Sequence, residues 1–80
     1  MAKIRSFTKA SHSIRPHKSE VDATYQLLTD DSGSTLFQLS TYGSDERKSE
    51  PKVSQTIQLD EKFARELIAA LEAAFGIAAR

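Results

Sequence analysis

The chain has 80 residues, equal numbers of acidic and basic side chains (eleven of each) and no cysteine. This length predicts one small domain with a modest hydrophobic core, which would gain stability by forming a homodimer. The composition excludes disulfides and thiolate metal sites, is typical of a cytoplasmic protein, and contains no apolar run near the roughly 18 residues that a membrane span needs.

The charges are divided unevenly along the chain. Residues 1–19 carry five bases and no acid, a net charge of +5, whereas residues 20–80 carry six bases and eleven acids, a net charge of −5. We therefore divide the chain into a basic N-terminal arm, residues 1–20, and a domain of residues 21–80. Such an arm suits an anionic partner such as nucleic acid, or it folds back on its own acidic domain. Within the arm, residues 2–7 have the weak alternation of a short first strand.

Three later segments alternate apolar and polar residues with a period of two, which predicts strands over 21–28, 35–42 and 53–59. The turn residues 30–34 join the first two as an antiparallel hairpin, and a charged loop, residues 43–52, leads to the third. The apolar residues of these strands would form the inner face of the sheet. They are Val21, Ala23, Tyr25, Leu27, Phe37, Leu39, Val53, Ile57 and Leu59.

The strongest prediction is an amphipathic helix over residues 60–75. Asp60 is a suitable N-cap and Gly76 a suitable C-terminal cap. Pairs of opposite charge, Glu61–Arg65 and Lys62–Glu66, lie four residues apart on the polar side.

Together these elements predict an α+β domain with a three- to four-stranded antiparallel sheet followed by one C-terminal helix, in the order ββββα. One helix covers about three strands, so part of the apolar surface would stay open in a monomer. A homodimer would cover it. The helix residues expected at the dimer interface are Phe63, Leu67, Leu71 and Phe75.

The sequence contains no convincing catalytic arrangement. His12 and His17 both lie in the arm, where nothing fixes them beside a nucleophile, and their spacing with Glu20 matches no usual metal site. Asp30 and Asp31 precede Ser-Gly and are better explained as turn residues than as an acid/base pair. We expect a protein that is not an enzyme and needs no cofactor or metal.

Two features could carry binding. Tyr42 ends a strand on its polar side, close to Arg47 and Lys48, and single-stranded nucleic acid uses aromatic stacking together with backbone charge. Taken alone, this segment is better explained as a tyrosine that caps the core, followed by a polar loop. The second feature is a row of outward polar residues, either a binding surface or a solvated sheet face. They are Thr24, Gln26, Gln38, Ser40, Ser54, Thr56 and Gln58.

The order of these segments resembles the PC4-like (p15-like) transcriptional coactivators and their small bacterial relatives, which are single-stranded DNA-binding domains. What carries the resemblance is a hydrophobic strand ending in an aromatic, a Lys/Pro loop, an alternating strand closing on Leu-Asp, and a Leu-rich helix. It covers about three quarters of the chain. The matching segments are residues 2–7, 20–31, 34–44, 46–52, 53–60 and 61–75.

The resemblance implies a homodimer that holds single-stranded DNA through basic and aromatic side chains, in a role related to transcription. One departure matters, because the family's sheet face is usually basic, whereas here it is neutral and Asp22 is acidic. The alternative is a protein-interaction or structural module that binds no nucleic acid. The candidate nucleic-acid contacts are Lys3, Arg5, Arg15, Lys18, Tyr42, Arg47, Lys48 and Lys52.

Overall fold

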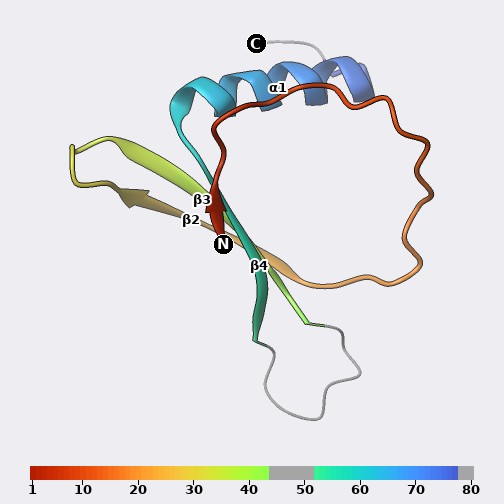
Figure 1. The fold of residues 1–80 in the computed structure, drawn as a ribbon, viewed down its shortest axis with the longest axis horizontal. Helices are drawn as coiled ribbons and strands as arrows, with labels where there is room; N and C mark the ends of the chain where they lie inside the picture. The colour runs from red at the N-terminus through yellow and green to blue at the C-terminus, as the bar shows by residue number, and fades with distance from the viewer. Residues whose placement is uncertain (44–51, 78–80) are drawn as a thin grey trace.

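The computed structural model describes residues 1–43 and 52–77 as four strands followed by one helix. They form one mixed sheet in the order β1-β4-β3-β2, with the helix on one side of it (Figure 1). The predicted α+β class and the order ββββα are therefore confirmed. The elements are β1 (Ala2–Lys3), β2 (Ala23–Thr29), β3 (Thr35–Tyr42), β4 (Val53–Leu59) and α1 (Glu61–Phe75).

The first strand differs from the prediction in length and direction. β1 has two residues rather than six, and it pairs parallel to β4, with Ala2 facing Ile57 and Lys3 facing Gln58. The prediction of an antiparallel sheet is therefore wrong for this strand. Residues 4–22 run past α1 and around a wide loop before β2 (Figure 1), and a connection of this length permits the parallel pairing that a tight turn forbids.

β2 and β3 form the predicted antiparallel hairpin, and Asp30 organises its turn. The Asp30 Oδ1 atom accepts hydrogen bonds from the Ser32 amide (2.9 Å), the Ser32 hydroxyl (2.7 Å) and the Ser34 amide (2.9 Å). Gly33 adopts a φ of 88°, which glycine reaches without a steric penalty. This turn fixes the register in which Gln26 faces Gln38.

The register sorts the strand side chains onto two faces of the sheet. On the apolar face, Tyr25, Leu39 and Ile57 form one cross-strand row, and Leu27, Phe37 and Leu59 form the next. On the polar face, Gln26, Gln38 and Gln58 form one row, and Thr24, Ser40 and Thr56 form the next. These central rows therefore have the composition predicted from the alternation.

The core is smaller than the sequence predicts. Only Leu36, Leu59 and Phe63 are buried apolar residues among those the structure describes, whereas Tyr25 is 71% exposed and Leu27 65% exposed. Leu36 was not expected in the core, because it lies on the polar face opposite Leu28. Most of the predicted inner face therefore lies on one side of the sheet but is largely uncovered. Two predicted members do not belong to it, because Val21 precedes β2 and the register shift at Tyr42 sets Val53 opposite Tyr42 on the polar face.

Both ends of α1 are capped as the sequence predicts. The Asp60 carboxylate accepts a hydrogen bond from the Phe63 amide at 3.1 Å, which satisfies one of the free amides of the first turn. At the other end, Gly76 takes a left-handed φ of 66° and the Ile77 amide donates to the Glu72 carbonyl at 3.0 Å.

One of the two predicted helix ion pairs forms. The Arg65 Nη2 atom lies 2.6 Å from the Glu61 carboxylate on the exposed side of the helix. Lys62 instead places its ammonium 5.3 Å from the centre of the Phe63 ring, where the ring face attracts a cation.

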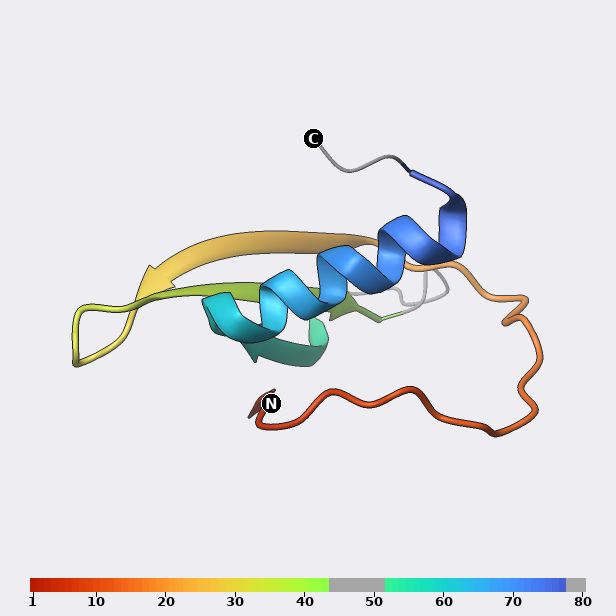
Figure 2. The same cartoon turned by 90° about the horizontal axis from the view of Figure 1, so that it is seen from above.

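The helix lies close to the sheet only at its beginning. Phe63 in the first turn is buried, Leu67 is half-buried, and Phe75 near the end is 73% exposed. Figures 1 and 2 show α1 rising away from the sheet as it runs towards the β2 side. The radius of gyration is 15.1 Å, against about 12 Å for a compact chain of this length, so the fold is open. No described helix is long and apolar enough to cross a membrane.

Candidate nucleic-acid interface

The polar face of the sheet carries an ordered set of hydrogen-bonding side chains. The Gln58 amide donates to the Gln38 carbonyl oxygen at 2.8 Å, and the Gln38 amide donates to the Ser40 hydroxyl at 3.3 Å. Ser40 and its cross-strand partner Thr56 are buried among their neighbours on this face. The central part of the face is therefore a fixed polar network rather than a set of freely moving side chains.

Tyr42 is placed on this polar face, at the end of β3. A register shift between Thr41 and Tyr42 sets Tyr42 opposite Val53. Its hydroxyl lies 3.0 Å from the Thr24 hydroxyl, so the ring is tied to the edge strand β2. This geometry disagrees with the interpretation of Tyr42 as a cap on the apolar core.

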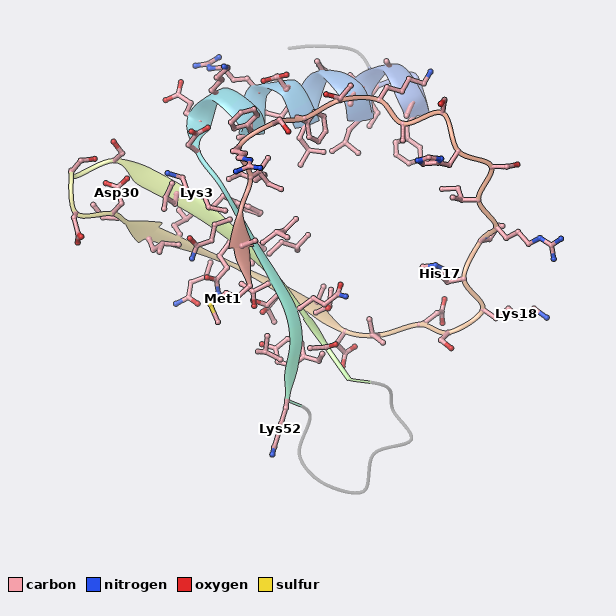
Figure 3. All side chains as sticks on the ribbon, in the orientation of Figure 1. Met1, Lys3, His17, Lys18, Asp30 and Lys52 are labelled. Atoms are coloured by element: carbon pink, nitrogen blue, oxygen red, sulfur yellow. The ribbon has the colours of Figure 1, made fainter. Side chains whose placement is uncertain are left out.

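The start of β4 brings a lysine close to Tyr42. The Gly43 amide donates to the Lys52 carbonyl at 3.1 Å, which holds the start of β4 beside the end of β3. Lys52 is exposed and its ammonium points away from the sheet (Figure 3). An aromatic ring and an exposed cation thus lie at one end of the polar face.

Lys3 supplies a second cation to the same face. It faces Gln58 in the register of β1 and β4, and its side chain points away from the space beneath α1 (Figure 3). Lys3 and Lys52 lie at separate places on the sheet (Figure 3). Lys3 lies at the β1 end of the glutamine row, and the hydroxyl row lies between the glutamine row and Lys52.

The turn aspartate at the corner of this face is held ionised. Hydrogen bonds from the Ser32 side chain, then from the Ser34 and Ser32 amides, lower the pKa of Asp30 below its usual value, and the charge of Lys3 adds to the effect. Asp22, whose carbonyl accepts from the Tyr42 amide at 3.0 Å, adds a carboxylate at the opposite end of β2. The face is therefore close to neutral overall, as the sequence indicates.

The remaining predicted contacts are spread along the arm or lie outside the described residues. Arg5, Arg15 and Lys18 are exposed in the connection between β1 and β2, and Figure 3 shows Lys18 on the far side of that loop from the sheet. Arg47 and Lys48 lie outside the described residues. Among the predicted contacts that the structure describes, Lys3, Tyr42 and Lys52 are the ones that lie at the sheet.

The apolar residues predicted at the dimer interface divide into two groups. Phe63 is buried within the fold itself, and Leu67 is half-buried. Leu71 (44% exposed) and Phe75 stay accessible. Of these residues, the ones in the last turns of α1 are therefore more accessible than the ones in the first turns.

His12 and His17 are exposed in the arm. In residues 1–43 and 52–77, no three histidine, cysteine, aspartate or glutamate side chains come together as a metal site would require. Searches against protein-family models, curated proteins and solved structures found no match to this chain.

Sequence reasoning missed the link between Thr24 and Tyr42. The signal was present, because the turn at residues 30–34 fixes a register in which residue numbers of facing pairs sum to 64. That register places Asp22 level with Tyr42 and brings Thr24, two residues along on the same face, next to it.

Proposed function

We propose that this chain is a small non-catalytic, cytoplasmic module that binds single-stranded nucleic acid on the polar face of its sheet and acts as a homodimer. The observation that carries the proposal is the position of Tyr42, held on the polar face by Thr24 with Lys52 next to it. A base that stacks on a tyrosine ring leaves its phosphate within reach of a lysine, which is how sequence-tolerant single-strand binders work. The role in transcription rests on the resemblance alone.

Thr24 and Gln26, which are exposed on this face, would contribute hydrogen bonds to the base edges, whereas Ser40 and Thr56 are buried. Amide and hydroxyl groups both donate and accept, and the rows of Gln26 and Thr24 run across three strands. The near-neutral face limits affinity, because phosphate contacts supply most of the non-specific binding energy. Modest affinity with a small salt dependence is the expected behaviour.

Fluorescence anisotropy with a labelled single-stranded oligonucleotide of about 20 nucleotides tests this function. Binding should weaken from about 50 to 200 mM salt, and Lys3→Ala should make the salt slope shallower by about 0.7, the loss of one phosphate contact. The matched control is Lys62→Ala, because Lys62 is a surface lysine on α1. No anisotropy change at low salt and high protein concentration would remove the proposal.

A protein-interaction module is the second candidate. It is favoured by the exposed apolar surface that includes Tyr25, Leu27 and Phe75, since exposed clusters of this kind often mark sites of association. This candidate predicts no salt-sensitive binding of any oligonucleotide, so the same titration separates the two.

A further inference from the structure

The two edges of the sheet are unequal. β1 forms one edge with only two residues, one of them Lys3, and short charged edges resist further pairing. β2 forms the other edge with the seven residues ATYQLLT, which include no charge and no proline. Within the described parts of the chain, β2 pairs with β3 alone. A strand of this kind is a template for another strand.

The hairpin shows which backbone groups of β2 point outward. The Asp30 amide donates to Ser34, and the Tyr42 amide donates to Asp22, so the even-numbered residues of β2 exchange hydrogen bonds with β3. In an antiparallel pair, hydrogen-bonding residues alternate along each strand. The amides and carbonyls directed to the free edge therefore belong to Ala23, Tyr25, Leu27 and Thr29.

We propose that two copies of this chain join through their β2 edges, antiparallel, about a two-fold axis that passes beside Gln26. In this register Tyr25 faces Leu27 of the second copy and Ala23 faces its Thr29. All four outward amides of each strand then meet an outward carbonyl. A shift of two residues in either direction leaves groups at the ends unpaired. The contact is self-complementary, as a two-fold interface must be.

The side chains agree with this register. Tyr25 and Leu27 are among the most exposed apolar residues of the strands, and each would face the other across the joint on the apolar face. The Tyr25 ring is already stacked on Phe37, with ring centres 5.5 Å apart, so it is positioned before a partner arrives. Aromatic residues facing aliphatic ones across strands are favourable pairs.

A two-fold axis perpendicular to the sheet keeps both apolar faces on the same side. The two helices would then stand on one side of a continuous eight-stranded sheet, counting four strands from each copy. The last turns of α1 lean towards β2 (Figure 2), so the exposed Leu71 and Phe75 would approach the axis. On the opposite side, the two polar faces would form one unbroken surface.

The same register carries one unfavourable feature. Asp22 of each copy would face Asp30 of the other at the ends of the joint, and like charges directly opposite each other weaken a strand pair. Added salt screens this repulsion. Dimerisation should therefore tighten with salt, whereas binding of nucleic acid should weaken, and Asp22→Asn should strengthen the dimer about threefold.

Cysteine cross-linking tests the register directly, because the chain has no cysteine of its own. Gln26 would face its own copy in a non-hydrogen-bonded pair, where the Cα atoms lie about 4.5 Å apart, within disulfide range. Gln26→Cys should therefore form a disulfide dimer under mild oxidation. Thr24→Cys and Leu28→Cys should each fail alone but cross-link when the two variants are mixed. Gln55→Cys, exposed on β4, measures random collision.

Sedimentation of the full chain gives the second readout. Leu27→Lys should raise the dissociation constant of the dimer at least tenfold. The circular dichroism spectrum should stay unchanged, because Leu27 is outside the core. Cross-linking of Gln26→Cys no faster than Gln55→Cys would overturn the proposal. If a dimer nevertheless formed, the homodimer in the proposed function, on which this inference rests, would survive through another surface. Loss of oligonucleotide binding with dimerisation unchanged would contradict the proposed function but not the β2 interface.

Discussion

Gln38 and Gln58 face each other across β3 and β4, and the Gln58 amide donates to the Gln38 carbonyl oxygen at 2.8 Å. The Gln38 amide donates a further hydrogen bond to the Ser40 hydroxyl. A face that looks like a simple solvated surface in sequence is therefore partly occupied by its own network. The pair links adjacent strands at the centre of the sheet, where it can affect both stability and binding.

Replacing Gln58 with methionine should destabilise the fold modestly. The change keeps the length of the side chain but removes the donor to Gln38, and a net loss of about 1 kcal/mol is typical for one such bond. The melting temperature should fall by roughly 4–8 °C for a domain of this size. Gln55→Met, at an exposed position on β4, is the control and should stay within about 0.5 kcal/mol of the parent. Equal shifts for both variants would contradict a structural role for the pair.

Two variants of Tyr42 separate the contribution of ring stacking from that of the hydroxyl hydrogen bond. Tyr42→Phe removes the hydroxyl that lies 3.0 Å from Thr24 but keeps the ring, whereas Tyr42→Ala removes both. If the ring stacks on bases, oligonucleotide affinity should be nearly unchanged in Tyr42→Phe. It should fall roughly five- to 150-fold in Tyr42→Ala, which corresponds to about 1–3 kcal/mol. Anisotropy titrations at one salt concentration measure this, and equal affinities for the two variants would exclude stacking at this position.

Asp30 should make the hairpin sensitive to acid. Hydrogen bonds from Ser32 and Ser34 lower its pKa in the folded state, so its contribution to stability is present above the unfolded pKa of about 3.9 and is lost as the pH falls through the lower folded value. Asp30→Asn keeps an oxygen acceptor but cannot titrate. Its free energy of unfolding should therefore decline less between neutral and acidic pH than that of the parent. Urea unfolding at a series of pH values checks this, and parallel curves for the two proteins would argue against the turn as the cause.

Asp60 should anchor the start of α1. Asp60→Ala removes the oxygen that accepts from the Phe63 amide, and loss of an N-cap costs about 1 kcal/mol. Asp60→Asn keeps an acceptor at the same place and should stay close to the parent. Thermal unfolding followed by circular dichroism at the helix wavelength compares the three proteins. The cap would be unimportant if alanine and asparagine gave the same melting temperature.

Local features of this fold were predictable from sequence because short-range physics decides them. The alternation in residues 35–42 and 53–59 gave the bounds of β3 and β4, and Asp60 and Gly76 marked the two ends of α1. In each case the residues that determine the structure are close together in the chain. Capping, turn chemistry and period-two patterning need no knowledge of distant partners.

Features that depend on distant segments were not predictable in the same way. Nothing in residues 2–7 reveals that β1 would lie parallel beside β4, because that choice depends on the path of residues 4–22. The exposure of Tyr25 depends on the angle at which α1 leaves the sheet, and alternation cannot specify that angle. For the candidate site, the polar rows were identified from alternation, but the hydrogen bond between Thr24 and Tyr42 required the register.

The small core makes Leu59 a sensitive position. Leu59 ends β4, is 5% exposed, and is one of three buried apolar residues in the described chain. Leu59→Ala removes three buried carbon atoms at the place where the sheet meets the first turn of α1, and such truncations cost about 2–5 kcal/mol. The free energy of unfolding of such a small domain is only about 5 kcal/mol, so the variant should be largely unfolded near 37 °C. The control is Ile14→Ala, at an arm residue that is 87% exposed. Its free energy of unfolding should stay within about 0.5 kcal/mol of that of the parent. Denaturant unfolding of both variants at one protein concentration provides the comparison. A small effect of Leu59→Ala would contradict the importance of this core, because the sheet and the first turn of α1 would then stay folded without the Leu59 side chain.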